Sequence, residues 1–449
     1  MKKGDIVDLE IESLAFGGEG ISRFKVDDRL FTIFVDGVVP KDKVRAKITG
    51  KKRRYARADL VEIIAEAPNR IKPKCKHFKE CGGCSMQNLS YRDQLAVKEQ
   101  YVKDSIVRIG KLNEDTVLPI IKCENEWNYR NKMEFSFDVT LDSVLNLGLH
   151  LKRKFHDVTV LTECHLFSED IGDLVVQMRD FFRSQNLPNP KCLKSLIVRR
   201  GVNTGEIMIV LMTENAEIPT SVLDEFCLIA KEVTSIYHID HINQQGERNT
   251  VKEKLLRGSP TITEILKLED GETLNFEISP LAFFQPNTSQ AQKLYSLAIE
   301  AANLTGKETV YDLYCGTGTI GMCAAHKAKK VFGVELNKSA VLNAEKNAEQ
   351  NAVENISFLT GDCAEMVAEI PDTPDTIILD PPRNGLHGKA FPVVAESGAK
   401  RIVYISCNPT SLARDLELFT KTGYTVKSVQ PVDMFPQTYH IESVAVLTK

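Results

Sequence analysis

The first part of the chain consists of short runs in which apolar and polar residues alternate. Such alternation predicts half-buried β-strands, here over residues 6–11, 31–35, 43–48 and 59–64. Glycines between the first two runs supply turns, and prolines after the last run mark a linker. We therefore expect residues 1–66 to form a small β-barrel.

The pattern changes twice further along the chain. Residues 67–275 mix strands, such as 195–199 and 206–211, with amphipathic helices, the clearest of which covers residues 91–109. From residue 276 onward strands alternate regularly with helices, as in a doubly wound α/β domain. The sequence thus predicts an α/β protein of three domains: a barrel, a central α+β domain, and a Rossmann-like domain at residues 276–449.

Length and composition agree with this division. A chain of 449 residues exceeds what one core usually organises. No run of about 18 apolar residues occurs, and the first residues lack the apolar stretch of a signal peptide, so we expect a cytoplasmic protein with no membrane partner. Eleven cysteines in such a chain favour metal ligation or catalysis over disulfides.

The net charge of −4 hides an asymmetry. Residues 1–75 contain 17 Lys and Arg against 12 Asp and Glu, a net +5 that leaves −9 for the remainder. The densest basic run, residues 51–57, lies between two predicted strands and includes Tyr55, so it could meet a phosphate backbone. A solvated hairpin tip is the alternative. Arg130 and Lys132 fall on one face of another predicted strand, where phosphate contacts or surface salt bridges would explain them equally well.

One cysteine ends a buried-strand pattern. The β-branched run that starts at residue 401 leads directly into Cys407, which Asn408 and Pro409 follow. Ligands of open α/β sheets bind at the carboxyl ends of the strands, so Cys407 is a candidate nucleophile. The alternative is an ordinary small core residue.

Acidic residues end successive predicted strands beside a glycine-rich turn at residues 315–321. They are Asp312, Glu335, Asp362 and Asp380. The glycines let the backbone approach a ligand closely, and a carboxylate at the end of the second strand can bind both hydroxyls of a ribose. The series predicts an S-adenosylmethionine site, with a nicotinamide enzyme as the alternative.

Three cysteines, Cys75, Cys81 and Cys84, surround a double glycine in a loop that can wrap around one metal centre. Their spacing suits tetrahedral zinc or an iron–sulfur cluster and does not choose between them. A fourth ligand must come from elsewhere. Cys164 is the best candidate, and His77 and His165 are its rivals.

Five short motifs follow one another in the second half of the chain. They are F-F-Q-x-N at 283–287, D-L-Y-C-G-x-G at 312–318, D-P-P-R at 380–383, S-C-N-P at 406–409 and H-x-E-S at 440–443. With the cysteine loop and the barrel before them, the chain resembles the uracil-5 RNA methyltransferases over nearly its whole length. It resembles specifically the 23S ribosomal RNA branch, which has a TRAM domain, an RNA-binding barrel of the OB type, and a [4Fe–4S] cluster.

The resemblance implies a role for each matching residue. Cys407 and Glu442 match the nucleophile and the base. The matches to the contacts of S-adenosylmethionine are Gln285, Tyr314, Glu335 and Asp380, with Asp362 near the adenine. The matches to the ligands of the [4Fe–4S] cluster are Cys75, Cys81, Cys84 and Cys164. Gln437 departs from the histidine more frequent in relatives, which bears on the fine positioning of the base.

These residue types suit methylation at C5 of uracil. C5 is a poor nucleophile, whereas C6 is electrophilic because it is conjugated with the C4 carbonyl. Addition of the Cys407 thiolate to C6 would activate C5 for methylation, and Glu442 would then remove the C5 proton. The base must leave its stack or already lie in a loop.

The resemblance implies a uridine in a loop of 23S ribosomal RNA as substrate, and we expect a monomer. Methylation of transfer RNA is the first alternative, disfavoured because enzymes of that branch look shorter and lack the TRAM domain and cluster cysteines. Cytosine-5 methylation would call for a second catalytic cysteine, and amino methylation for an aromatic residue at Arg383. A non-catalytic RNA-binding or ribosome assembly factor is the alternative from another class.

Overall fold

The computed structural model describes residues 1–449 except 27–28, 169, 217, 231 and 244–249. A six-stranded sheet, a seven-stranded sheet, a two-stranded hairpin and a second seven-stranded sheet follow one another along the chain. No helix in the described ranges has the length and hydropathy needed to cross a membrane.

The N-terminal sheet curls around its own core. Its strands are β1 (Ile6–Glu10), β2 (Ser13–Leu14), β3 (Gly20–Val26), β4 (Arg29–Val35), β5 (Lys43–Lys51) and β6 (Tyr55–Ala65), in the order β1-β5-β6-β4-β3-β2. Leu9 on edge strand β1 packs in the same cluster as Ile33 on β4 and Ala56 on β6. The four strands predicted from alternation correspond to β1, β4, β5 and β6.

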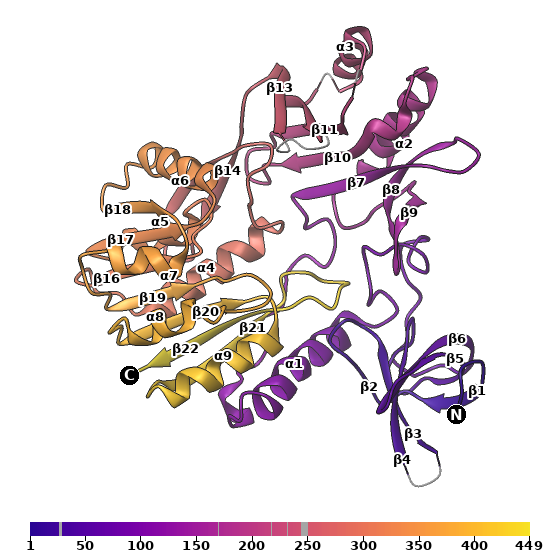
Figure 1. Cartoon of the computed structure of the whole chain (residues 1–449), viewed down its shortest axis with the longest axis horizontal. Coiled ribbons are helices and arrows are strands. Elements are labelled where there is room, and N and C mark those ends of the chain that lie inside the picture. The colour runs from indigo at the N-terminus through magenta and orange to yellow at the C-terminus, as the bar shows by residue number, and fades with distance from the viewer. Residues whose placement is uncertain (27–28, 169, 217, 231, 244–249) are drawn as a thin grey trace.

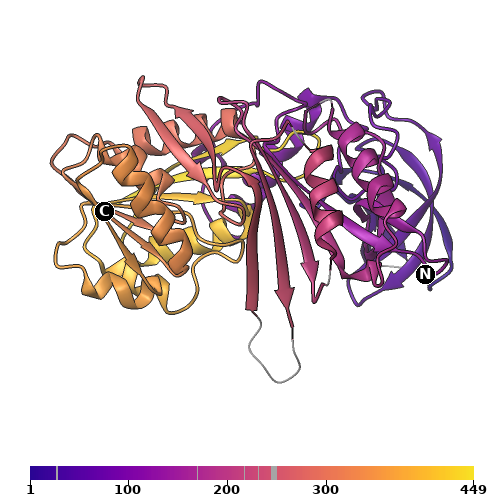
Figure 2. The same ribbon diagram turned by 90° about the horizontal axis from the view of Figure 1, so that it is seen from above.

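The central sheet has a separate layer on each face. Its strands are β7 (Lys132–Val139), β8 (Leu145–Leu151), β9 (Lys154–Val160), β10 (Leu193–Arg200), β11 (Ile207–Glu214), β12 (Ser235–Ile242) and β13 (Thr250–Gly258), in the order β13-β12-β11-β10-β7-β8-β9. Helices α2 (Ile171–Ser184) and α3 (Thr220–Ile229) cover one face. The other face shares a core with the hairpin β14 (Ile262–Lys267) and β15 (Thr273–Ile278), as the view in Figure 2 illustrates.

Arg130 lies outside the central sheet. Strand β7 begins only at Lys132, and the backbone N–H of Arg130 donates to the carbonyl of Leu166 instead of to a neighbouring strand. The expectation that Arg130 and Lys132 share one face of a strand is therefore wrong. Lys132 does lie in the sheet, directly opposite Arg199.

The C-terminal sheet is doubly wound. Its strands are β16 (Thr309–Leu313), β17 (Lys330–Glu335), β18 (Ile356–Thr360), β19 (Thr376–Leu379), β20 (Arg401–Ser406), β21 (Thr425–Val432) and β22 (Glu442–Thr448), in the order β18-β17-β16-β19-β20-β22-β21. The strands run parallel from β18 to β20, and β22 is antiparallel to both of its neighbours.

Two layers of helices cover this sheet (Figure 1). One core contains residues of α4 (Thr288–Ala302), α5 (Thr319–Ala325) and α6 (Lys338–Gln350). The opposite core contains residues of α7 (Cys363–Met366), α8 (Ala390–Glu396) and α9 (Pro409–Lys421). Strands buried by helices on both faces read as continuous apolar runs, which is why residues 401–406 show no alternation.

Helix α1 (Tyr91–Arg108) belongs to this second layer although it precedes the central sheet in sequence (Figure 1). Ser90 caps its first turn by accepting from the N–H of Asp93. Val102 and Ile106 are buried in the core that α9 lines. The segment after α1 then pairs with β21 through bridges at Val117 and Ile121.

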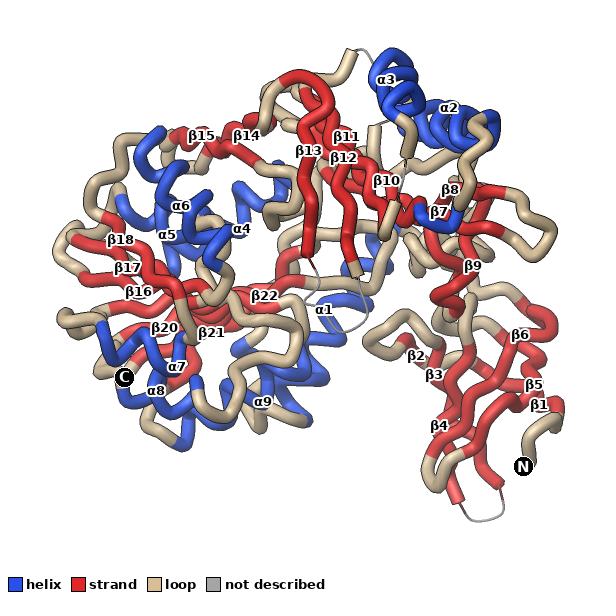
Figure 3. Tube along the Cα trace, turned by 45° about the horizontal axis from the view of Figure 1, so that its top comes forward, coloured by secondary structure: helices blue, strands red, loops and turns tan. Residues whose placement is uncertain are grey.

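The N-terminal sheet contacts both other parts of the molecule. In Figure 3 it lies next to β9 of the central sheet and near α1. Leu14 and Val39 pack with Met86 and Tyr101 in one buried cluster. On the other side, Arg153 in the β8–β9 turn donates to Glu19 at 2.7 Å. The domain boundaries at residues 66 and 275 remain predictions.

Candidate active site and cysteine cavity

Strands β20 and β22 bring Cys407 and Glu442 together. Their antiparallel register pairs Ser406 with Ser443. The next residues, Cys407 just after β20 and Glu442 at the start of β22, therefore oppose each other at the end of the sheet. Opposed residues share a face of the sheet, so thiol and carboxyl point to the same side. The negative charge of Glu442 is correspondingly one of the causes that raise the pKa of Cys407.

Cys407 lies between a strand and the start of a helix. Asn408 caps α9 by accepting from the N–H of Thr410 at 3.0 Å, and Pro409 occupies the first turn, where its missing N–H has no cost. The positive end of the helix dipole favours a nearby thiolate. This local sequence therefore fixes the thiol at the carboxyl end of the sheet.

Burial and neighbouring carboxylates raise the pKa values of both Cys407 and Glu442. Burial, with the charges of Glu442 and Asp380, raises the pKa of Cys407 to about 11, and Arg383 opposes this shift. Burial and Asp380 likewise raise the pKa of Glu442 well above its ordinary value, again opposed by Arg383. A carboxyl with a raised pKa is suited to accept a proton near neutral pH.

The four predicted acidic residues do follow successive strands. Asp312 lies on β16, Glu335 ends β17, Asp362 follows β18, and Asp380 follows β19. Burial raises the pKa of both Asp312 and Asp380 to about 7. Asp362 accepts from the N–H of Ala364 at 2.8 Å and so caps the short helix α7.

The glycine-rich turn is held between two of these acids. Glu335 accepts from the N–H of Gly316 at 3.1 Å, and Asp312 accepts from the N–H of Gly321 at 2.7 Å. A Cβ on Gly318 would lie 2.7 Å from the ring of Phe358, and one on Gly321 would lie 2.8 Å from the Asp312 carboxylate. A side chain at either position would clash with its neighbour, so the tight packing of this turn requires glycine at both.

Two buried polar atoms in this turn have no hydrogen-bond partner among the described residues. They are the hydroxyl of Tyr314 and Oδ1 of Asp312. Tyr314 also has a φ of 65°, a strained conformation for a residue other than glycine. Buried polar groups are rarely left unpaired, so a polar ligand at this edge would fit them.

Gln285 lies in the loop before α4. It is buried, and its carbonyl accepts from Asn131 at 2.8 Å. Phe283, two residues earlier, is 65% exposed. An exposed aromatic ring beside a buried polar residue is suited to stack on a planar ligand.

The four cysteines predicted as metal ligands line one cavity of about 20 Å³. They are Cys75, Cys81, Cys84 and Cys164. Burial and the neighbouring thiols raise the pKa of Cys84 to about 12, and burial raises that of Cys75 to about 11. The structure thus brings together residues of the loop and a residue some eighty positions later.

The double glycine allows the cysteine loop to approach β8. A Cβ on Gly82 would lie 2.9 Å from the carbonyl oxygen of His150, and one on Gly83 would lie 3.0 Å from Leu149. Gly82 donates to that same carbonyl at 2.9 Å. The loop is tied to the Cys164 segment because Lys76 donates its backbone N–H to Glu163 at 2.8 Å.

The structure distinguishes the two alternative ligands, His77 and His165, by their position relative to the cavity. His77 bonds Thr162 at 3.2 Å and does not line the cavity, whereas His165 does. No group of three His, Cys, Asp or Glu side chains within the described ranges converges as one metal ion requires. A zinc ion bound at about 2.3 Å needs sulfurs about 4 Å apart, but a cluster separates its sulfurs by its own width. The structure therefore gathers the four thiols around one cavity, and this grouping is the observation that bears on a metal centre.

Sequence reasoning missed a buried ion pair near the site. Lys98 on α1 donates to Asp433 at 2.6 Å, and both side chains are fully buried. Asp433 lies in the segment that leads to Glu442. In the sequence, this pair is signalled only by Lys98, a polar residue on the inner face of the amphipathic helix α1.

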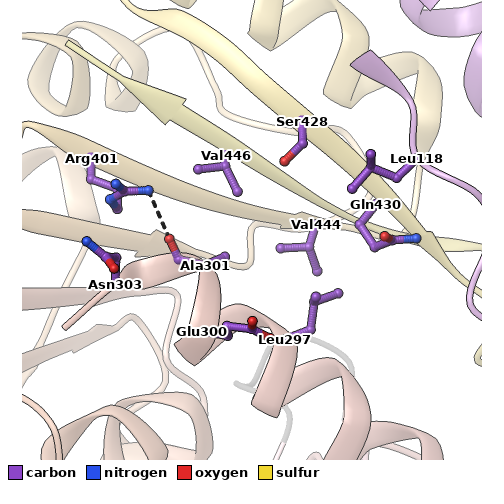
Figure 4. A pocket seen from close by; sticks show the side chains of 10 residues that line it. All are labelled: Leu118, Leu297, Glu300, Ala301, Asn303, Arg401, Ser428, Gln430, Val444 and Val446. Carbon is purple, nitrogen blue, oxygen red and sulfur yellow. Dashed lines mark hydrogen bonds between the residues drawn. The ribbon is translucent and has the colours of Figure 1, made fainter. Parts of the chain in front are cut away.

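A larger cavity of about 420 Å³ lies further along β20 and β22. Val444 and Val446 of β22 and Leu297 of α4 line it, with Arg401 at its edge (Figure 4). Arg401 begins β20 and Cys407 follows its end, so the two are about 20 Å apart along the strand. Cys407 and Glu442 do not line this cavity, although Val444 lies two residues from Glu442 on the same strand.

Comparisons with known proteins agree with this geometry. The sequence model described as "tRNA (Uracil-5-)-methyltransferase" matches residues 90–449, and that of the TRAM domain matches residues 1–61. A protein of Clostridium tetani named "Uncharacterized RNA methyltransferase" is 36% identical, with 100% of this chain and 99% of that protein covered. A protein of Listeria innocua with a similar name is 37% identical, with 100% and 98% covered.

Among solved structures, the chain is similar to the tRNA (uracil-54, C5)-methyltransferase of Pyrococcus abyssi in complex with S-adenosyl-L-homocysteine. The TM-score is 0.75 and the identity 25%, with 98% of this chain and 100% of that chain covered. The similarity therefore extends through the N-terminal sheet and the cysteine loop.

Proposed function

The chain belongs to the tRNA (uracil-5-)-methyltransferase family and is an S-adenosylmethionine-dependent RNA methyltransferase, and we propose that it methylates C5 of a loop uridine in 23S ribosomal RNA. The observation that best supports uracil-5 chemistry is the opposition of Cys407 and Glu442 at the end of β20 and β22. This arrangement gives one nucleophile and one proton acceptor on the same side of a base.

Cys407 acts as the nucleophile. Its sulfur adds to C6 of the uracil, and the electron pair of the C5–C6 bond moves into an enolate that extends over C5 and the C4 carbonyl. C5 would then take the methyl group of the donor as the bond between that methyl and the donor's sulfonium sulfur breaks, and the sulfur would leave with the electron pair as a neutral thioether. Because burial raises the pKa of the thiol to about 11, Cys407 releases its proton to solvent only as substrate binds, and Arg383 and the amino end of α9 stabilise the resulting thiolate.

Glu442 completes the reaction. Its carboxylate accepts the proton from C5, the C5–C6 double bond re-forms, and the bond between C6 and Cys407 breaks. The thiolate leaves with its electron pair, so atoms and charge balance. Burial favours this role because it raises the proton affinity of the Glu442 carboxylate.

The methyl donor, S-adenosylmethionine, supplies an electrophilic methyl group when bound. We infer that Gln285, Tyr314, Glu335 and Asp380 hold it, with Asp362 near its adenine. The unpaired Tyr314 hydroxyl and the unpaired oxygen of Asp312 support this site, because a polar ligand would satisfy both. Glu335 at the end of β17 is placed to accept from ribose hydroxyls.

We infer that Cys75, Cys81, Cys84 and Cys164 hold a [4Fe–4S] cluster. Four thiols lining one buried cavity support this inference. The cluster would tie the loop after the barrel to the segment after β9, so its contribution would be structural.

The N-terminal sheet and Phe283 would hold the RNA. In the basic run, Lys51 donates to the carbonyl of Met1 and Arg57 to Glu19, so these two charges are engaged within the protein. Lys52, Arg53 and Arg54 are exposed and stay available for phosphates. The exposed ring of Phe283 would stack on a base near the site.

Transfer RNA is the second candidate substrate. The Pyrococcus abyssi enzyme, named for tRNA uracil-54, matches over 98% of this chain, so the presence of the front segments does not exclude a tRNA substrate. The expectation that enzymes of the tRNA branch lack those segments is therefore no longer an argument against a tRNA substrate. The 23S assignment then rests on the motif resemblance.

Mapping of modified nucleosides tests the substrate. Ribosomal and transfer RNA from cells with and without this protein should be digested and examined by mass spectrometry. We expect 5-methyluridine to disappear from one or more positions of 23S RNA and to remain in tRNA. Loss from tRNA with unchanged 23S RNA would contradict the proposal and favour the second candidate.

A further inference from the structure

Residues 433–441, called here the base segment, connect β21 to β22 and lead into Glu442. Val432 and Glu442 are cross-strand neighbours, so the segment leaves and re-enters the sheet at one place. It is too long for a tight turn, which would fix its shape locally. Its conformation must therefore come from contacts with other parts of the chain.

Four consecutive carbonyls of the base segment each accept a hydrogen bond from a different element. Met434 accepts from Asn287 at 2.8 Å, and Phe435 accepts from Lys98 at 3.0 Å. Pro436 accepts from the hydroxyl of Tyr129 at 2.9 Å. Gln437 accepts from the backbone N–H groups of Ser85 and Met86, both at 3.0 Å. The middle of the segment is thus held by four other parts of the chain.

Gln437 is the most strongly constrained of these residues. Its φ is 68°, a left-handed conformation that costs a residue other than glycine about 1 kcal/mol. Such a conformation persists only where the surroundings determine it. Gln437 is 2% exposed, so those surroundings are protein.

Gln94 on α1 supplies the matching partner. Its Oε1 accepts from the backbone N–H of Gln437 at 2.9 Å, and its Nε2 donates to Oε1 of Gln437 at 3.0 Å. The same Nε2 lies 3.1 Å from the carbonyl of Met86 and 2.9 Å from that of Leu89. One buried amide therefore joins α1, the end of the cysteine loop and the base segment.

Helical spacing places Gln94 in a continuous stripe. Tyr91, Gln94 and Lys98 lie on one face of α1 at i, i+3 and i+7, and each contacts the base segment. Tyr91 donates to Asp433 at 2.9 Å, beside the Lys98–Asp433 pair. Figure 1 shows α1 beneath the loop between β21 and β22.

The N-terminal sheet reaches the same place. The ring of Phe16 packs edge-on against Tyr439 at 5.5 Å and against Tyr101 of α1 at 6.0 Å. A Cβ on Gly18 would lie 3.2 Å from Ser85, which shows how closely this turn approaches the end of the cysteine loop. Contacts from three parts of the chain thus converge on the residues just before Glu442.

We propose that Gln94 is a positioning residue for the base: its paired amide holds Gln437 in the left-handed conformation and so sets where the Glu442 carboxyl meets C5. The proposal rests on the proposed role of Glu442. Without Gln94, the buried N–H of Gln437 loses its acceptor, and the segment relaxes toward an ordinary conformation. Proton removal from C5 then slows, whereas addition of Cys407 does not, because β20 and α9 hold that residue.

The test compares Gln94→Met with Gln100→Met, a matched control on an exposed turn of the same helix. Each variant is incubated with substrate RNA and methyl donor. Turnover is measured together with the fraction of protein that is covalently bound to RNA on a denaturing gel. We expect Gln94→Met to lower turnover about tenfold and to raise the covalent fraction, because loss of a buried hydrogen bond costs about 1 to 3 kcal/mol. Gln100→Met should match the wild type.

A second variant guards against misfolding. Asn tolerates the left-handed region, so Gln437→Asn keeps the backbone while its shorter side chain withdraws from Gln94. The covalent fraction should rise again, by less. Lower turnover without a higher covalent fraction in both variants, or unchanged turnover in Gln94→Met, would overturn the inference.

Glu442→Gln, run in parallel, separates this inference from the proposed function. If Glu442→Gln accumulates the covalent complex and Gln94→Met does not, only the positioning role fails. If Glu442→Gln turns over normally without accumulating it, the role of Glu442 fails, and the inference about Gln94 fails with it.

Discussion

Cys407 and Cys84 are both partly buried thiols with raised pKa values, yet their neighbours differ completely. Glu442, Asp380 and Arg383 act on Cys407. Three further thiols act on Cys84, together with the side chain of Gln87. Burial alone therefore does not tell a nucleophile from a metal ligand. The neighbours differ in what they can do, because acids and a cation can transfer a proton and stabilise charge, whereas a set of thiols is suited to share a metal centre.

The strongest test of this contrast removes the isolated thiol. Cys407→Ala should lower turnover by roughly four orders of magnitude or more, because no other group in the site can add to C6. Binding of S-adenosylmethionine, measured by calorimetry, should stay near the wild-type value. Cys227→Ala, at a half-exposed thiol away from both sites, is the control. Appreciable methylation by Cys407→Ala would refute the nucleophile assignment.

The next test removes the acid beside that thiol. Glu442→Gln should slow turnover by about three orders of magnitude while a covalent protein–RNA complex accumulates, because addition and methylation precede the lost step. Denaturing gels with labelled RNA measure the complex. Turnover of Glu442→Gln at the wild-type rate would show that another group takes the proton.

Substitutions in the cysteine cavity should change the metal content of the protein and not the reaction at Cys407. Anaerobically purified protein should contain about four irons per chain, and Cys84→Ser should lose most of them. Cys227→Ser should keep its iron. Iron analysis and absorbance spectra measure both. A single zinc per chain in fully active, colourless wild-type protein would contradict the cluster.

The buried acids near Cys407 should also make the stability of the folded protein depend on pH. Burial raises the pKa of Asp312 from 3.8 to about 7. The folded state therefore holds this proton more tightly than the unfolded state, and the resulting stability is lost as pH rises from about 4 to 7. The melting temperature of the apo protein should fall by roughly 5 °C between pH 5 and pH 8.

Asp312→Asn should make this slope shallower, with Asp380 accounting for the rest because its pKa is raised in the same way. The Asn oxygen still accepts from Gly321, so the turn is preserved. Melting curves across this pH range measure the slopes. An unchanged slope in the variant would show that Asp312 is already ionised in the folded protein.

The smallest effect concerns the front of the molecule. Replacing Lys52, Arg53 and Arg54 by alanine should reduce the salt dependence of RNA binding by about two units of slope and leave S-adenosylmethionine binding unchanged. Lys307→Ala, an exposed lysine before β16, is the control. Parallel salt lines for wild type and the triple variant would mean that these charges are only solvated.

Local patterns in the sequence were sufficient for the strands and for the motif residues. Alternation located β1, β4, β5 and β6, and helix α1 ends within one residue of its predicted end. The motifs singled out Cys407, Glu442, Asp312 and Asp380 as candidates, because each motif is a short stretch with its own chemistry. The family resemblance is confirmed over the whole chain.

The contacts that hold the site together could not be read from the sequence. Lys98 and Asp433 are 335 residues apart, and neither lies in a recognisable motif. Helix α1 gives no sign that it packs on a sheet formed by the last third of the chain. Gln437 drew notice only as a departure from relatives, whereas its left-handed backbone and its bond to Gln94 emerge from the fold.

The most direct test of the account locates the covalent bond. The Glu442→Gln protein, trapped with RNA and methyl donor, should be digested with nuclease and protease and its peptides analysed by mass spectrometry. The account predicts a methylated uridine nucleotide attached to the peptide that contains Cys407, and to no other cysteine peptide. A nucleotide on a different cysteine, or methylated RNA with no attached peptide at any time, would contradict it.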